Sequence, residues 1–154
     1  AVVKGIKIDL FFSPTHSSLM EALTIAGLGP AYEAWKRGVV EISARNGAAL
    51  WDFGGYTRLT TIDLSDAQQN FIDASHYRPE VGRRILSIMD GRRPVQSDVK
   101  SLGVRLTPEN FDDHLRTQRL ARAAYRATHP ADVAAIKHTA CSGKHSGNFP
   151  GCRR

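Results

Sequence analysis

The sequence predicts an α/β fold built on a parallel sheet, because two apolar segments of strand character flank a helical segment. Residues 6–12 begin with alternating polar and apolar side chains, become continuously apolar and end at Ser13-Pro14. Residues 48–53 form a second apolar run that ends at two glycines. A strand, a helical crossover and another strand form a right-handed parallel unit in nearly all known proteins. We therefore expect the first strand near the middle of a parallel sheet, covered on both faces.

The segment between these strands predicts two helices. Ser17 or Ser18 can cap a first helix, which the glycines and proline of residues 27–30 interrupt. A second helix should begin near Ala31, and Asn46-Gly47 supplies a left-handed stop. The apolar residues of this second helix recur at helical spacing and are expected in the core, namely Tyr32, Trp35, Val39 and Ile42.

The rest of the chain predicts two more helices and sets the domain boundaries. One helix should start at Pro79 and end at Gly91, and another should run from Thr107-Pro108 to about Thr128. Residues 92–103 are polar, contain a proline and show no period, which is typical of a surface linker. We therefore divide the chain into an α/β unit at 1–91, a linker with an appended helix at 92–130, and a flexible polar tail at 131–154.

Composition and charge restrict the class of protein. The 154 residues are 42% hydrophobic and 23% charged, as in an ordinary globular domain, and the net charge of +6 favours anionic partners. No signal peptide is visible, and no apolar stretch approaches the roughly 20 residues needed to span a bilayer. Nucleic acid is an unfavoured partner, because no aromatic stacking platform accompanies the arginines that share one helix sector. These arginines are Arg116, Arg119, Arg122 and Arg126.

The only cysteines, Cys141 and Cys152, lie in a polar, glycine-rich segment and leave three interpretations open. In an oxidising compartment they can close a small disulfide loop. With His138 and His145 they can suggest a metal site, although the spacing matches no standard zinc pattern. A frayed terminus is favoured over a metal site, so we expect no metal.

Asp73 and His76 are the strongest candidates for catalytic residues. They are three positions apart, directly before the helix that starts at Pro79. An aspartate that accepts a hydrogen bond from one imidazole nitrogen fixes the tautomer, and the other nitrogen is then able to take a proton from a serine. The alternative is an aspartate at a helix entry beside an incidental exposed histidine.

Three further residues are candidates for substrate binding because ligands meet the carboxyl ends of parallel strands. Ser13 and His16 follow the first strand, and Asp52 follows the second. We expect their loops to converge with the Asp73 to His76 loop in one cleft. Each residue has an ordinary alternative: a turn hydrogen bond for Ser13, a bond to backbone for His16, and a cap on the following turn for Asp52.

Four ordered segments resemble the C-terminal half of bacterial SGNH (GDSL-like) hydrolases. They cover roughly residues 5 to 90 and read Phe-Phe-Ser-Pro-Thr-His, Tyr-Glu-Ala-Trp-Lys-Arg, Trp-Asp-Phe-Gly-Gly-Tyr and Asp-Ala-Ser-His-Tyr-Arg-Pro-Glu-Val-Gly. The resemblance implies a three-layer α/β/α flavodoxin-like sheet, of which this chain would hold only the C-terminal strands and helices. It also implies that His76 is the general base and that Asp73 orients it.

What the resemblance implies about function is an esterase or acyltransferase that acts on acylated small molecules or envelope polysaccharides. Such proteins are periplasmic or envelope-bound, often behind an N-terminal anchor, and their serine triad requires no cofactor. The Gly-Asp-Ser type motif that carries the family's nucleophile is absent from this sequence, and so are its oxyanion-hole blocks. We therefore expect a portion of a longer hydrolase that supplies the Asp-His pair. The alternative from another class is a non-catalytic module whose basic surface binds an anionic polymer.

Overall fold

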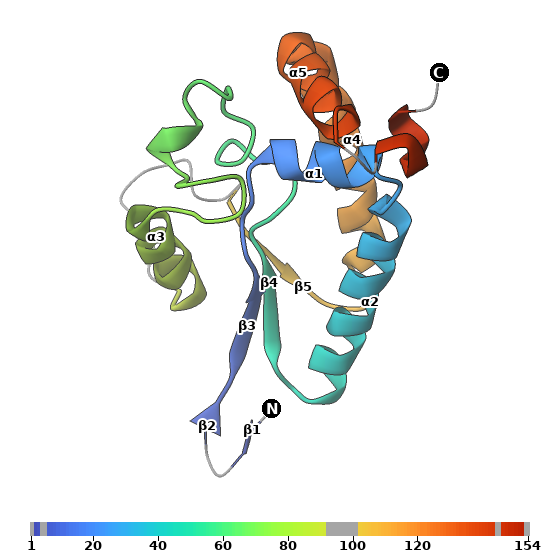
Figure 1. Cartoon of the computed structure of the whole chain (residues 1–154). Helices are drawn as coiled ribbons and strands as arrows, with labels where there is room; N and C mark the ends of the chain where they lie inside the picture. The colour runs from blue at the N-terminus through green and yellow to red at the C-terminus, as the bar shows by residue number, and fades with distance from the viewer. Residues whose placement is uncertain (1, 4–5, 92–101, 144–145, 153–154) are drawn as a thin grey trace.

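The computed structural model describes residues 2–3, 6–91, 102–143 and 146–152 of the chain. The described part is an α/β structure of short strands and longer helices (Figure 1). Its strands are β1 (Val2–Val3), β2 (Ile6–Lys7), β3 (Asp9–Phe12), β4 (Ala49–Asp52) and β5 (Val104–Leu106). Its α-helices are α1 (Ser17–Ile25), α2 (Gly29–Arg45), α3 (Pro79–Met89), α4 (Phe111–Thr128) and α5 (Pro130–Cys141).

The main sheet is mixed rather than wholly parallel. Strands β3 and β4 pair in parallel, with Asp9 opposite Ala49 and Phe12 opposite Asp52, which confirms the predicted strand, crossover and strand. Strand β5 adds antiparallel to β4, so the expectation of a purely parallel sheet is wrong. No residue pattern indicated β5 because three residues are too few to establish an alternation.

The order β3-β4-β5 places β3 at the end of the described sheet, not near its middle. Leu10 and Phe11 are 38% and 37% exposed, so the apolar run that suggested a strand covered on both faces is only partly covered. A separate antiparallel pair, β1 with β2, precedes β3.

Helices pack on both faces of the sheet, and each face has its own core cluster. Helices α2 and α4 lie on one side and α3 lies on the other (Figure 1). The cluster on the α2 and α4 side comprises Phe12, Val40, Leu50, Leu106, Phe111 and Leu115. The cluster on the α3 side comprises Phe53, Leu59, Phe71, Val81, Ile85 and Leu102. Phe71, which precedes the Asp73 to His76 segment, thus packs in the same cluster as Val81 and Ile85 of α3.

Helix α2 follows its sequence signals at both ends but not on its buried face. A proline lies in its first turn, and Gly47, with φ of 62°, follows its end. Its buried residues are Lys36, Val40 and Ser43, one residue out of phase with the apolar series that the sequence suggested. Trp35 is therefore 54% exposed and rests an edge of its ring against Phe12, which corrects its expected place in the core.

The C-terminal segments are more regular than the sequence suggested. The helix expected from Thr107 begins at Phe111, after β5, and the segment expected to be a polar tail contains α5. Most of the expected linker, residues 92–101, lies outside the described residues. A disulfide joins Cys141 to Cys152 and folds the segment that contains Pro150 back onto Gly27 at the end of α1. Within the described ranges, no helix is long and apolar enough to cross a membrane.

Candidate functional site

Asp73 organises the tight turn that carries His76. Phe71 and Tyr77 form an antiparallel bridge at the base of the turn, and the Ile72 amide donates to the His76 carbonyl at 2.7 Å. At the tip, Oδ1 of Asp73 accepts hydrogen bonds from the amides of Ser75 and His76 at 2.8 and 2.9 Å. This is the arrangement by which an aspartate side chain replaces a backbone acceptor in a turn.

The other carboxylate oxygen of Asp73 fixes the His76 ring. Nδ1 of His76 lies 2.7 Å from Oδ2 of Asp73. Because a carboxylate only accepts, Nδ1 carries the proton, and Nε2 of the neutral ring is an acceptor. Hydrogen bonds from Ser75 and His76 hold the pKa of Asp73 well below its usual range. The side chain of His76 is 72% exposed and that of Asp73 is 56% exposed, so Nε2 of His76 is accessible from solvent.

No hydroxyl in the described ranges is hydrogen-bonded to Nε2 of His76. Ser75 is the nearest in sequence, but its hydroxyl donates to Oδ1 of Asp73 at 2.8 Å and lies 3.1 Å from Nδ1 of the ring. Ser75 therefore supports the orienting aspartate and is on the wrong side of the imidazole to be its nucleophile. Ser13 is exposed on its own loop.

His16 is buried and bonds to its own surroundings. Its Nδ1 accepts from the Ser18 amide at 3.2 Å, so the side chain caps α1, and its Nε2 consequently donates to the Ile62 carbonyl at 2.9 Å. The ring edge also contacts Phe71. The geometry of His16 is that of the ordinary alternative, a histidine that bonds to backbone.

Asp52 is buried at the end of β4 in a cluster with two basic side chains. Its Oδ1 accepts from the Gly54 amide at 3.0 Å, which is the turn cap that the sequence favoured. Its Oδ2 accepts from Lys36 of α2 and, at 2.7 Å, from Nε2 of His114 on α4. Burial alone would raise the pKa of Asp52, but His114 and Lys36 outweigh burial and hold it below its usual value.

The three loops meet through their backbones, while their candidate side chains diverge. The His16 amide donates to the Ala74 carbonyl at 2.9 Å, and the Phe53 amide donates to the Phe12 carbonyl at 3.2 Å. The loop after β3 and the Asp73 to His76 loop are therefore adjacent through the first of these backbone bonds, and the loop after β4 follows the strand that pairs with β3. However, the His16 and Asp52 side chains are buried, whereas those of Asp73 and His76 are exposed, so only the last two are brought together at the surface.

A second buried carboxylate, Glu21 of α1, was not among the residues that the sequence suggested. Both of its oxygens bind Arg122, at 2.7 and 3.0 Å, and Arg126 and the Tyr56 hydroxyl add bonds at 2.8 and 2.7 Å. Burial alone would raise the pKa of Glu21, but Arg122, Tyr56 and Arg126 together lower it. The arginine series on one helix sector was the available signal, and its carboxylate partner lies 101 positions from Arg122.

The remaining arginines of that series are also paired. Arg116 binds Asp113 at 2.8 Å, and Arg119 binds both oxygens of Glu33 at 3.1 and 2.5 Å. Each arginine considered as a phosphate contact thus has a carboxylate of this chain beside it. The geometry favours a structural role for the series.

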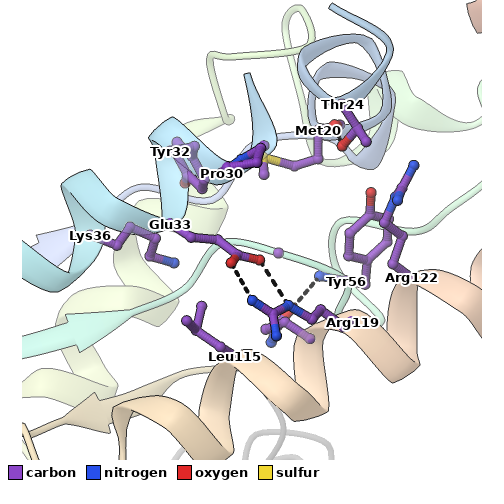
Figure 2. Close-up of a pocket in the computed structure, with 13 residues that line it drawn as sticks. Met20, Thr24, Pro30, Tyr32, Glu33, Lys36, Tyr56, Leu115, Arg119 and Arg122 are labelled. Carbon is purple, nitrogen blue, oxygen red and sulfur yellow. Dashed lines mark hydrogen bonds and ion pairs between the residues drawn. The ribbon is translucent and has the colours of Figure 1, made fainter. Parts of the chain in front are cut away.

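A cavity of about 350 Å³ lies between α1, α2 and α4 (Figure 2). The apolar part of its wall is formed by Met20, Pro30, Tyr32 and Leu115. The ion pair between Glu33 and Arg119 lies across the cavity. The cavity is separate from the Asp73–His76 turn, since neither residue lines it. The described residues also contain no cluster of three or more His, Cys, Asp or Glu side chains arranged to hold a metal ion.

Comparisons of the chain with models of protein families, with curated proteins and with solved structures find no match.

Proposed function

We propose that Asp73 and His76 form the base half of a serine-hydrolase type site that cleaves or transfers acyl esters. The observation that carries the proposal is the 2.7 Å bond from Nδ1 of His76 to Asp73, with Nε2 accessible. The resemblance of residues 5 to 90 to SGNH hydrolases supports the same assignment and suggests an acylated small molecule or envelope polysaccharide as substrate. A periplasmic or envelope location belongs to the same proposal.

In the proposed reaction, Nε2 of His76 takes the proton of a hydroxyl as that oxygen bonds to the ester carbonyl carbon. The tetrahedral intermediate then breaks its bond to the leaving oxygen, which receives the proton back from Nε2. Asp73 accepts from Nδ1 throughout and stabilises the imidazolium that forms between the two steps. The depressed pKa of Asp73 keeps the carboxylate ionised, as this role requires.

The proposal assigns to this chain the base and its orienting carboxylate, not the nucleophile. The hydroxyl that reacts is a serine of the SGNH type, whose motif this sequence does not contain, or in its place a water molecule. The alternative of a module whose basic surface binds anionic polymer is less well supported, because the arginines that share one sector of α4 are paired with carboxylates.

Turnover of an aryl acetate ester tests the proposal, measured on the intact protein that supplies the nucleophile together with this chain. His76→Ala should lower the rate by about 100-fold, the scale of general-base catalysis. His138→Ala is the matched control, since His138 is an exposed histidine on α5, and its rate should equal that of the wild type. Equal rates for His76→Ala and wild type would show that the assignment is wrong.

A fluorophosphonate probe then distinguishes the two sources of the hydroxyl. Labelling that His76→Ala abolishes indicates a serine nucleophile, which peptide mapping locates. Turnover that depends on His76 without labelling indicates that the base acts on water.

A further inference from the structure

Among the described residues, the outer edge of β3 is an unpaired strand edge with exposed apolar side chains nearby. In the described sheet, β4 pairs with β3 on one side only. Ile6, Ile8 and Leu10 are 62%, 38% and 38% exposed along this segment. An exposed apolar edge is a template on which another strand can pair, and proteins that keep such an edge generally cover it.

The hydrogen-bond pattern indicates which residues present backbone groups at this edge. The Phe12 carbonyl accepts from Phe53, which follows β4, so Phe12 directs its backbone groups towards β4. Because successive residues of a strand alternate, Asp9 and Phe11 direct theirs outward. The 3.2 Å ion pair between Lys7 and Asp9 places these two side chains on one face, as expected if the backbone stays extended from Lys7 to Asp9. Lys7 therefore also directs its backbone groups outward. Figure 1 draws β1 on the β4 side of β2, away from this edge.

We propose that the partner of this edge is a second copy of the chain, paired antiparallel about a two-fold axis at Ile8. In this register Lys7 of one copy lies opposite Asp9 of the other. Their outward amides and carbonyls exchange two hydrogen bonds, and their side chains form an ion pair, twice per dimer. Ile8 faces Ile8 of the second copy, and Ile6 faces Leu10.

Charge complementarity favours a second copy of the chain as the partner and an antiparallel direction of pairing. A parallel pair in register would put lysine beside lysine and aspartate beside aspartate, which is unfavourable. The antiparallel pair is self-complementary and closed, so it gives dimers rather than fibres.

Charge reversal tests the register by sedimentation velocity over a range of concentrations. The wild type should dimerise, and Lys7→Asp and Asp9→Lys should each weaken the dimer at least about tenfold, because each places like charges opposite one another twice. An equimolar mixture of the two variants should recover dimers, since every opposed pair is then of opposite charge. Glu80→Lys, which reverses an exposed charge on α3, is the control and should dimerise as the wild type does.

Cysteine cross-linking provides a second readout that does not depend on the charges. Under mild oxidation Ile8→Cys should form a covalent dimer, because directly opposed residues without mutual hydrogen bonds approach to about 4.5 Å between Cα atoms. Leu10→Cys should not, since the two Leu10 positions are displaced from the axis in opposite directions. A wild type that stays monomeric, a mixture that fails to recover dimers, or equal cross-linking of both variants would overturn the proposal.

Discussion

Among the described residues, two Asp–His pairs have the same 2.7 Å separation and opposite surroundings. Asp73 and His76 belong to one turn and are exposed, whereas Asp52 and His114 come from β4 and α4 and are buried. The buried pair has a third member, Lys36, whose ammonium group binds the same carboxylate oxygen as His114. Hydrogen-bond geometry alone therefore does not distinguish a candidate catalytic pair from a structural one.

Solvent access and the number of partners make the distinction. Oδ2 of Asp52 has two donors of this chain, and its imidazole partner is enclosed, so substrate has no approach to the ring. Oδ2 of Asp73 has one donor, and the far nitrogen of that ring is accessible. We accordingly expect changes in the buried pair to alter stability and changes in the exposed pair to alter chemistry.

The largest expected effect is on the buried cluster. Lys36→Met removes the ammonium that neutralises Asp52 and lies over the rings of Phe12 and Tyr32, at 4.7 and 5.6 Å from their centroids. Breaking a buried ion pair by removing one partner costs about 3–5 kcal/mol of unfolding free energy. Chemical denaturation should show a loss of that size. Arg83→Met, which breaks the exposed pair with Glu80, should lose no more than about 0.5 kcal/mol. Similar losses for the two variants would contradict a stabilising role for the buried cluster.

The loss of folding stability at acid pH should depend on Asp52 more than on Asp73. Both carboxyls have folded-state pKa values below their usual value of 3.8. A depressed pKa means that the unfolded chain binds more protons, so stability is present above the ordinary value and falls as pH drops through the folded-state pKa. Solvent screens the electrostatic interactions of the exposed Asp73, whereas those of the buried Asp52 are screened much less. Protonation of Asp52 should therefore cost more stability.

Thermal unfolding between neutral pH and pH 3 measures this difference. Asp52→Asn should flatten the decline of Tm towards acid pH, compared with the wild type, even though it lowers Tm at neutral pH. Asp73→Asn should leave the decline nearly unchanged. If Asp73→Asn flattened the decline of Tm more than Asp52→Asn does, the loss of stability at acid pH would arise at the surface turn.

The two Asp–His pairs also differ in how far the sequence predicted them. The Asp73–His76 contact spans three positions and was predictable because one turn brings the side chains together. The parallel pairing of β3 with β4 joins distant segments and followed from the general rule for a strand, a helical crossover and a strand, whereas the helix stop at Gly47 followed from a similarly local signal. Local contacts depend on short stretches of chain, which residue patterns encode directly.

The buried clusters were not predictable because their members lie far apart in the sequence. Asp52 binds residues 16 and 62 positions away, and which residues of α2 and α4 it meets depends on how those helices rotate against the sheet. The same rotation exposes Trp35 and buries Lys36, opposite to what their hydrophobicity suggests. Neutralisation by Asp52 makes the buried lysine tolerable, and neither residue type signals the other in advance.

The smallest effect on stability, and the sharpest contrast with the buried pair, is expected at the exposed turn. His76→Ala removes a largely exposed ring, so the free energy of unfolding should change by no more than about 0.5 kcal/mol. Asp73→Asn keeps a side-chain oxygen for the Ser75 and His76 amides but removes the carboxylate that accepts from Nδ1. The His76 ring should then lose its preference for the Nδ1–H tautomer, which long-range 1H–15N correlation spectra report directly. A large loss of stability in either variant, or an unchanged tautomer in Asp73→Asn, would place the exposed pair in the same structural category as Asp52 and His114. Retained stability with a changed tautomer would instead show that Asp73 acts on the ring and not on the fold, which is what an orienting carboxylate does.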